Sequence, residues 1–373
     1  MGKHVVVLGG YAPSLINFRG PLLRHLIGDG HRVEAWAPDD APEVSRHLAE
    51  LGATYRRVAL ARTGLNPFTD LWTLATLYFA LRDARPDVLI AYTAKPVIYG
   101  TLAARLAGVR YCFALITGLG YAFGGESTAR RWLTRLTALL YRIALKGAGV
   151  VFFQNPDDRA LFLGRRIVPE AKVRLLSGSG VDLGRFAPAS TPGRPRTFLM
   201  IARLLRDKGV YEFVEAARLV RSRHPDARFV LVGPFDRNPA AIPAGAVEAW
   251  QREGVVEYLG ELHDVRPQIA ACAVYVLPSY REGMPRTVLE AMAMGKPVIT
   301  TDVPGCRAAV AHGNNGLLVP ARDAKALAGA MLQLVENPAL VASMGAASLR
   351  RAREEFDVNR VNAAMIEAMG IGA

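Results

Sequence analysis

The feature that most constrains the fold is a regular alternation of short apolar, β-branched runs with longer helical patterns, which occurs twice along the chain. Several runs are apolar at nearly every position, as expected of parallel strands that are covered on both faces. This alternation predicts two α/β domains, each with a doubly wound parallel sheet. The predicted strands are residues 5–8, 32–36, 88–90, 111–115, 149–153, 198–201, 228–232, 255–259, 274–277, 298–300 and 317–319.

A proline-rich segment separates the two sets of predicted strands. Residues 186–195 contain three prolines and one glycine, a composition that is typical of a linker. A chain of 373 residues is also long enough to bury two cores. We therefore predict an N-terminal domain over residues 1–190 and a C-terminal domain over residues 191–354.

Residues 278–307 contain two carboxylates that stand eight residues apart. Gly283 breaks the chain after Glu282, and Pro285 stands where a helix would begin, so Glu290 falls about two turns into that helix. Loop amides and a helix N-terminus suit a bound phosphate, and ionised carboxylates accept hydrogen bonds from sugar hydroxyls. The segment therefore indicates a sugar-nucleotide site, although an ordinary strand–loop–helix unit with solvated glutamates fits the spacing equally well.

A basic segment precedes these carboxylates by about 70 residues. Arg203 and Lys208 stand on either side of Asp207, which we expect to orient the lysine. Cations placed beside a leaving diphosphate stabilise the negative charge that grows on it. A surface loop that is merely rich in basic residues is the alternative interpretation.

Together the two segments resemble the signature of glycosyltransferase family 4, whose members are retaining enzymes with the GT-B fold. The resemblance covers nearly the whole chain and is strongest over residues 197–307. It implies an α/β architecture of two Rossmann-like domains that face each other across a cleft, with a C-terminal helix at about residues 355–373 packing on the N-terminal domain. Residues 65–68, 117–120 and 302–306 further resemble bacterial enzymes that extend lipid-diphosphate-linked oligosaccharides, including those of the N-acetylgalactosaminyltransferase type.

The resemblance implies roles for individual residues. Glu282 would contact the donor sugar near its anomeric centre, and Glu290 would hold the ribose hydroxyls. The implied catalytic residues are Glu282, Arg203 and Lys208. The implied nucleotide-sugar-binding residues are Gly9, Gly10, Arg203, Lys208, Gly283, Met284, Arg286 and Glu290. The expected donor is a UDP-sugar. We expect no cofactor and no metal, because the sequence contains no D-x-D triplet that could hold a cation against the diphosphate.

The first predicted strand of the N-terminal domain ends at Gly9 and Gly10. A glycine pair lets the backbone approach a phosphate, and a tight strand–helix turn is the alternative explanation. Thr117 stands at about the position where many family members have a histidine, so the sequence identifies no general base. The front-face mechanism that is usually invoked for these enzymes requires none, because the leaving phosphate oxygen takes the acceptor proton.

Positive charge is concentrated in the first half of the chain. Residues 1–190 contain 24 Lys and Arg against 14 Asp and Glu, within a total net charge of +13. Residues 128–146 predict a helix with a basic stripe and apolar side chains on its other side, and residues 65–81 add apolar bulk. These features indicate contact with an anionic membrane surface or a lipid-linked diphosphate, and the alternative is a core-facing helix with a solvated basic face. The candidate acceptor or membrane residues are Thr117, Arg131, Arg135, Arg142 and Lys146.

The sequence thus predicts a retaining transferase that moves a hexose or N-acetylhexosamine from a nucleotide sugar to a polyprenyl-diphosphate-linked saccharide in bacterial glycan assembly. No signal-peptide pattern and no run of about 18 apolar residues is found. We therefore expect a cytoplasmic protein that is peripheral on the inner face of the cytoplasmic membrane. Three cysteines far apart in sequence predict reduced, mostly buried thiols.

Four alternatives to this transferase are compatible with parts of the sequence. They are a sugar-nucleotide epimerase of the same architecture, a family 4 transferase with a soluble acceptor, a nicotinamide-dependent oxidoreductase and a nucleic-acid-binding protein. The epimerase lacks an evident set of histidines, and the oxidoreductase lacks a G-x-G-x-x-G turn. No nucleic-acid partner is expected, because the chain carries no recognisable reader motif.

Overall fold

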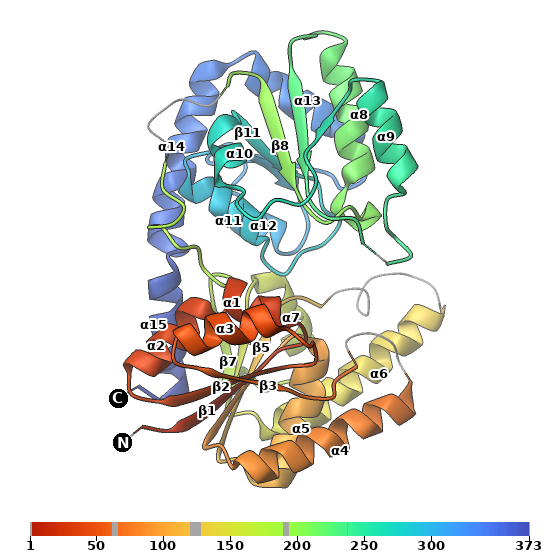
Figure 1. Ribbon diagram of the computed structural model, residues 1–373. Coiled ribbons are helices and arrows are strands. Elements are labelled where there is room, and N and C mark those ends of the chain that lie inside the picture. Colours follow the sequence, from red (N-terminus) through yellow and green to blue (C-terminus); the bar gives the residue numbers. More distant parts are fainter. Residues whose placement is uncertain (1, 62–65, 120–127, 189–193, 237, 373) are drawn as a thin grey trace. The chain divides into compact units, whose positions relative to one another are not determined.

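The computed structural model describes residues 2–61, 66–119, 128–188, 194–236 and 238–372 (Figure 1). The chain forms two compact units, Met1–Ser179 together with Asn359–Ala373, and Gly180–Val358. Both units have the α/β architecture that the alternating sequence pattern predicts. No helix within the described ranges is long and apolar enough to cross a membrane.

A parallel sheet forms the centre of the N-terminal unit. Its described strands follow the order β3-β2-β1-β4-β5-β6-β7. The central strand β4 is buried at every position, which explains why its sequence is continuously apolar. The strands are β1 (His4–Leu8), β2 (Arg32–Ala37), β3 (Thr54–Arg57), β4 (Val88–Tyr92), β5 (Tyr111–Ile116), β6 (Val150–Phe153) and β7 (Val173–Leu175).

Helices cover both faces of this sheet. Leu22 of α2 and Met365 of α15 belong to the core on one face, and Leu77 of α4 and Ala138 of α6 belong to the core on the other. Figure 1 shows α1–α3 and α4–α6 on opposite sides of the strands. The helices are α1 (Pro13–Asn17), α2 (Gly20–Gly28), α3 (Pro42–Glu50), α4 (Pro67–Ala84), the π-helix η1 (Pro96–Gly100), α5 (Thr101–Ala107), α6 (Thr128–Ala144), α7 (Pro156–Gly164), the short turns η3 (Leu145–Gly147) and η4 (Glu170–Lys172), and the C-terminal α15 (Val358–Met369).

The C-terminal unit contains a second parallel sheet, whose described strands follow the order β10-β9-β8-β11-β12-β13. Its strands are β8 (Thr197–Ile201), β9 (Arg228–Val232), β10 (Glu257–Tyr258), β11 (Val274–Leu277), β12 (Val298–Thr301) and β13 (Gly316–Val319). Its helices are η5 (Arg206–Lys208), α8 (Val210–Arg221), α9 (Ala244–Arg252), α10 (Arg266–Ala271), α11 (Arg286–Ala293), α12 (Cys306–Ala309), α13 (Ala324–Val335) and α14 (Pro338–Glu355).

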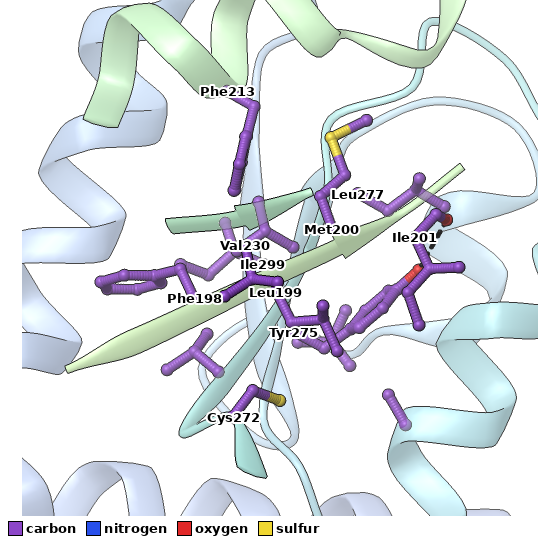
Figure 2. Close-up of a cluster of buried hydrophobic side chains, with 14 of the residues drawn as sticks. Phe198, Leu199, Met200, Ile201, Phe213, Val230, Cys272, Tyr275, Leu277 and Ile299 are labelled. Atoms are coloured by element: carbon purple, nitrogen blue, oxygen red, sulfur yellow. Dashed lines mark hydrogen bonds between the residues drawn. The ribbon is translucent and has the colours of Figure 1, made fainter. Parts of the chain in front are cut away.

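The core of the C-terminal unit is built around β8, as Figure 2 shows. Phe198 stacks on Phe229 with ring centroids 5.1 Å apart. Tyr275 is fully buried, and its hydroxyl donates to the carbonyl of Ile201 at 3.1 Å and hydrogen-bonds with Oγ1 of Thr287 at 2.6 Å. Because a buried hydroxyl is costly without partners, these bonds fix β11 and the start of α11 against the end of β8.

Every predicted strand is present, with ends that differ by at most a few residues, but two strands were missed. These are β3 and β7, whose sequences T-Y-R-R and V-R-L are short and largely exposed. Both lie at an edge of their sheet, where a strand needs less apolar surface and resembles a polar loop.

The contact boundary between the units lies at Ser179, whereas the predicted boundary lies at residue 190. The backbone N–H of Val358 donates to the carbonyl of Val181 at 3.0 Å, and Phe186 is part of the C-terminal core. These contacts tie the segment after Ser179 to the C-terminal unit. Residues 189–193 of the predicted linker lie outside the described residues.

Candidate functional site

The two segments identified in the sequence meet at one edge of the C-terminal sheet. Strands β8, β11 and β12 end at Ile201, Leu277 and Thr301, and the loops that follow them carry the candidate residues. Since the carboxyl ends of parallel strands lie at one edge of a sheet, residues far apart in sequence become neighbours there. This edge is where ligands bind in open α/β sheets.

Glu282 is held by two donors on the same carboxylate oxygen. Nζ of Lys208 lies 2.5 Å from Oε1 of Glu282, and Oγ of Ser279 lies 2.8 Å from it. The side chains of Lys208 and Glu282 are 21% and 14% exposed, so the pair is largely shielded but still open on one side. No hydrogen bond reaches Oε2 of Glu282 from the residues that the structure describes. That oxygen can therefore accept a hydrogen bond from a ligand.

Close backbone packing fixes the loop that carries Glu282. The N–H of Glu282 donates to the carbonyl of Pro304 at 3.2 Å, in the loop after β12. Gly305 has a φ of +81°, and a Cβ on it would lie 2.4 Å from the carbonyl oxygen of Glu282. Only glycine fits such an approach with a left-handed backbone, so Gly305 lets the loop that carries Glu282 pack closely on the loop after β12.

Glu290 lies in the second turn of α11 and is only 6% exposed. Its Oε1 is 2.8 Å from Nε of Arg286, one turn earlier in the helix. Burial raises the pKa of the Glu290 carboxyl, and the charges of Arg286 and Arg185 oppose this rise. The predicted loop-and-helix arrangement is present, because Pro285 is the residue before α11 and Gly283 and Met284 precede it in the loop.

Arg203 forms an ion pair of its own and does not take part in the Lys208–Glu282 pair. Its NH1 lies 2.7 Å from Oδ2 of Asp236, and its side chain is 51% exposed. Among the described residues no hydrogen bond or ion pair joins Arg203 to Lys208 or Glu282. Lys208 pairs with Glu282, and among the described residues no hydrogen bond joins it to Asp207, so the structure gives no support to the expectation that Asp207 orients Lys208.

Tyr280 was not identified from the sequence, yet it joins three parts of the site. Its hydroxyl donates to Oε1 of Glu212 in α8 at 2.6 Å, and its N–H donates to Asp207 in η5 at 2.9 Å. The guanidinium of Arg322 lies 4.7 Å from the centre of its ring. Ser279 and Tyr280 immediately precede the glutamate loop, which was the available signal, but nothing local in the sequence pointed to Glu212 or Arg322.

In the N-terminal unit, Gly9 and Gly10 follow the end of β1, as predicted. A Cβ on Gly9 would lie 2.3 Å from the hydroxyl of Tyr92, which is 2.7 Å from Oγ of Ser14. The guanidinium of Arg19 lies 4.9 Å from the centre of the Tyr92 ring. Packing against Tyr92 is therefore enough to require glycine at position 9, whether or not a phosphate approaches.

Thr117 follows β5 directly and is half-buried. Residue 120 of the segment 117–120 and residue 65 of the segment 65–68 lie outside the described residues. Residues 117–119 lie directly after β5, and residues 66–68 lie at the start of α4.

The exposure of the α6 side chains argues against the alternative interpretation of this helix as a core-facing element. Its four basic candidates, Arg131, Arg135, Arg142 and Lys146 of the following turn, are exposed as expected. The apolar residues Trp132, Leu136, Leu139 and Ile143, which that alternative placed against the core, are also 42–68% exposed. The core side consists mainly of Thr137, Ala138, Tyr141 and Ala144. Small alanines let the helix pack closely on its neighbours and leave the larger apolar side chains outside.

Neither a metal centre nor a reactive thiol is found in the part of the chain that the structure describes. No group of three or more His, Cys, Asp or Glu side chains there could hold a metal ion. Cys112, Cys272 and Cys306 are buried and unpaired, as predicted. Burial raises the pKa of Cys306, which lies near Glu282 and Lys208, to about 12, so this thiol remains protonated at neutral pH.

Comparison with known proteins agrees with this geometry. Residues 195–337 match the family described as glycosyl transferases group 1, and residues 19–178 match the glycosyl transferase 4-like domain. The chain is 31% identical, over 88% of both chains, to the N,N'-diacetylbacillosaminyl-diphospho-undecaprenol alpha-1,3-N-acetylgalactosaminyltransferase of Campylobacter jejuni subsp. jejuni serotype O:2. It is 28% identical, over 73% of this chain and 72% of the relative, to the UDP-Gal:alpha-D-GlcNAc-diphosphoundecaprenol alpha-1,3-galactosyltransferase of Escherichia coli.

Solved structures agree with the fold. Sucrose-phosphate synthase from Thermosynechococcus elongatus superposes with a TM-score of 0.80 over 98% of both chains at 20% identity. HepE of Anabaena in complex with UDP superposes with a TM-score of 0.76 at 18% identity, over 98% of this chain and 99% of that one. The fold and the carboxyl-edge site thus define a glycosyltransferase of the GT-B class. Within that class the chain belongs to glycosyltransferase family 4.

Proposed function

We propose that this protein transfers a hexose or N-acetylhexosamine from a UDP-sugar, with retention of anomeric configuration, to a polyprenyl-diphosphate-linked saccharide in bacterial glycan assembly. The observation that carries the proposal is the contact of Lys208 and Ser279 with one oxygen of Glu282. This contact gives a cation and a carboxylate at the edge of the sheet where the nucleotide would bind. The two relatives named above, whose names specify diphospho-undecaprenol acceptors, support the choice of acceptor.

The donor would bind to the C-terminal unit. The backbone amides of Gly283, Met284 and Arg286, at the N-terminus of α11, suit the diphosphate. Glu290 would accept hydrogen bonds from the ribose, and Glu282 would accept one from a sugar hydroxyl near the anomeric carbon. A diphosphate carries more negative charge than one carboxylate, so it would compete with Glu282 for Lys208 and leave that glutamate available to the sugar.

The chemical step breaks the bond between the anomeric carbon and the diphosphate oxygen and forms a bond to the acceptor oxygen on the same face. The acceptor proton passes to the leaving phosphate oxygen, so no dedicated base is required. Lys208, Arg203 and the helix N-terminus would stabilise the charge that grows on the diphosphate. Arg203 would have to exchange Asp236 for phosphate to do so. With these cations we propose that neither a metal nor a cofactor takes part.

The acceptor would bind to the N-terminal unit. Thr117 follows the carboxyl end of β5, and the exposed basic side chains of α6 are Arg131, Arg135 and Arg142, with Lys146 just beyond. These groups suit an anionic membrane surface or the diphosphate of the lipid carrier. We therefore propose a cytoplasmic protein that is peripheral on the inner face of the membrane and has no nucleic-acid partner.

The decisive experiment offers the purified protein a panel of UDP-sugars with a polyprenyl-diphosphate-linked saccharide and determines the anomeric configuration of the product. We expect transfer with retention from one UDP-hexose or UDP-N-acetylhexosamine, and thermal stabilisation by UDP but not by NAD or an oligonucleotide. Inversion, or stabilisation by NAD alone, would refute the proposal. Conversion of one UDP-sugar into its epimer without acceptor would favour the epimerase, and transfer only to free sugars would favour a soluble acceptor.

A further inference from the structure

Helix α4 is apolar on both of its sides. Thr73, Leu77 and Leu81 are buried against the N-terminal sheet. On the outer side lies a set of large apolar residues that we call the α4 row, namely Phe68, Leu71, Trp72 and Phe79, which are 82%, 64%, 66% and 66% exposed. A helix on the surface of a globular protein normally carries polar side chains on its outer side. An exposed apolar stripe of this kind indicates a surface that is covered by a partner.

A second exposed apolar stripe lies in the same layer of helices. It is the α6 row, namely Trp132, Leu136, Leu139 and Ile143. Leu77 of α4 and Ala138 of α6 belong to one core cluster on the same face of the sheet. Between these helices lies α5, whose Leu106 is 65% exposed. Figure 1 shows the three helices on one side of the strands. Both rows therefore lie on the outer side of this helix layer, which faces away from the sheet.

The fold puts the first residues of both helices at the carboxyl edge of the sheet. Helix α4 ends at Ala84 and leads into the start of β4, and α6 precedes β6 in the same way. Both helices therefore run antiparallel to the strands. Nζ of Lys95, which follows β4, lies 2.6 Å from Oδ1 of Asp70 in the first turn of α4. Phe68 and Trp72 consequently lie near the edge at which this type of sheet binds ligands.

The charge around the two rows restricts what can cover them. The acids of α4, α5 and α6 are Asp70, which is buried and paired with Lys95, and Asp83, which pairs with Arg56. The exposed basic side chains of these helices and of the residues that follow α4 and α6 are Arg82, Arg85, Arg105, Arg131, Arg135, Arg142 and Lys146. A second copy of the chain facing this surface would oppose like charges, whereas anionic lipid headgroups would complement them.

We propose that the α4 row inserts into the interfacial region of an anionic bilayer, with the α6 row and the surrounding basic side chains at the headgroups. The inference rests on the proposed function, because a lipid-linked acceptor requires the enzyme to reach a membrane. It goes further by assigning the apolar contact to α4. Trp and Phe favour the membrane interface, and apolar insertion resists salt in a way that contact between charges does not.

A tryptophan measurement tests the insertion directly. Trp36 and Trp250 are buried, so Trp72 and Trp132 are the exposed tryptophans of the chain's four. In the Trp132→Phe protein, Trp72 alone reports from the surface. With vesicles of phosphatidylcholine and phosphatidylglycerol that carry brominated acyl chains, its emission should shift to the blue and be quenched. Co-sedimentation of this protein with vesicles while Trp72 emission stays unchanged would overturn the proposal.

A double variant and a control variant measure how much the α4 row contributes to vesicle binding. Phe68→Ser combined with Trp72→Ser should weaken vesicle binding by about tenfold at high salt, because the lost apolar burial is insensitive to ions. The matched control is Leu219→Ser, at an exposed leucine of α8, and it should bind as the wild type does. Circular dichroism and thermal unfolding establish that the variants fold.

Two outcomes of this comparison would overturn the proposal. One is equal binding of the double variant and the control. The other is a wild-type dimer, seen in size-exclusion chromatography without lipid, that the double variant abolishes, which would make the row a contact between copies. UDP stabilisation of the wild type is measured separately, so a failure of the proposed transferase function is distinguishable from a failure of the membrane contact.

Discussion

Two donors hold Glu282 by the same oxygen, so this side chain is positioned before any sugar arrives. We predict that Glu282→Ala mainly lowers kcat and leaves KM for the donor little changed, because contacts near the anomeric carbon strengthen during transfer. Steady-state kinetics over a range of UDP-sugar concentrations measure both constants. Transfer by Glu282→Ala at the wild-type rate would exclude Glu282 from the site.

Lys208 is the cation nearest to Glu282, at 2.5 Å. We predict that Lys208→Ala lowers turnover by about two orders of magnitude or more, the scale expected when a charge-stabilising donor is lost. Arg203→Ala should have an effect of the same order if Arg203 leaves Asp236 on donor binding. The wild type should remain active in EDTA. Loss of activity on chelation with rescue by manganese or magnesium would refute the metal-free scheme.

Glu290 allows a role in binding to be separated from a role in stability. Burial raises the pKa of Glu290, so the folded protein binds this proton more tightly than the unfolded chain does. The stabilisation that this group contributes is therefore present at low pH and is lost as pH rises through the raised pKa. We predict that Glu290→Gln gains free energy of unfolding, relative to wild type, as pH rises from acidic to neutral, while its affinity for UDP falls. Denaturant titrations and calorimetry measure these quantities, and unchanged UDP affinity would refute the ribose contact.

At the scale of elements, α6 combines exposed basic and exposed apolar side chains. We predict that a variant with glutamine in place of Arg131, Arg135, Arg142 and Lys146 binds anionic vesicles more weakly than the wild type. Its binding should also depend less on salt, since each basic side chain contributes about 1 kcal/mol near such a surface. Transfer to a membrane-embedded acceptor should slow. Flotation of the protein with vesicles at several salt concentrations measures the binding. Equal binding of wild type and variant would mean that these side chains are only solvated.

One of these four residues needs its own control. The guanidinium of Arg142 donates to the carbonyl of Arg165 at 2.9 Å and to that of Arg166 at 3.2 Å. Arg142→Gln alone therefore removes a link between α6 and the end of α7. Its thermal unfolding measures how much of the four-site effect is structural.

At the scale of the whole molecule, the last helix completes the first domain. Met365 of α15 is 1% exposed and belongs to the same core cluster as Leu22 of α2. We predict that Met365→Ala lowers the free energy of unfolding by about 2–5 kcal/mol, the usual range for such a truncation in a core. Since α15 lies in the N-terminal unit, stabilisation by UDP should persist. An unchanged free energy of unfolding would contradict the first expectation, and loss of the stabilisation by UDP would contradict the second.

Much of the fold could be predicted because it is encoded in short-range patterns. The buried runs of β1, β4 and β8 are apolar at every position or nearly so. A glycine pair follows β1, and Pro86 and Pro195 precede β4 and β8. The edge strands β3 and β7 could not be found in this way. Their pairing comes from a neighbouring strand and leaves little trace in their own residues.

The candidate site was predictable in its members but not in its contacts. The order and spacing of the segments around Arg203 and Glu282 were visible in the sequence. The pairing of Lys208 with Glu282 and of Arg203 with Asp236 was not, because it depends on loops that follow different strands. Tyr280 and Glu212 are 68 residues apart and meet only because β8 and β11 are neighbours in the sheet.

The sequence by itself determined the class of fold, the two domains and the family, since these depend on periodicity and on motifs within a few residues of one another. Only the tertiary structure decided which side of α6 and α4 faces outward and which charges pair. Helical periodicity defines a stripe but not the neighbour that covers it. Trp132 and Phe68 remain exposed because other residues of the same helices, among them Ala138 and Leu77, take the places against the sheet. That choice depends on close packing between elements distant in sequence, which no local pattern records.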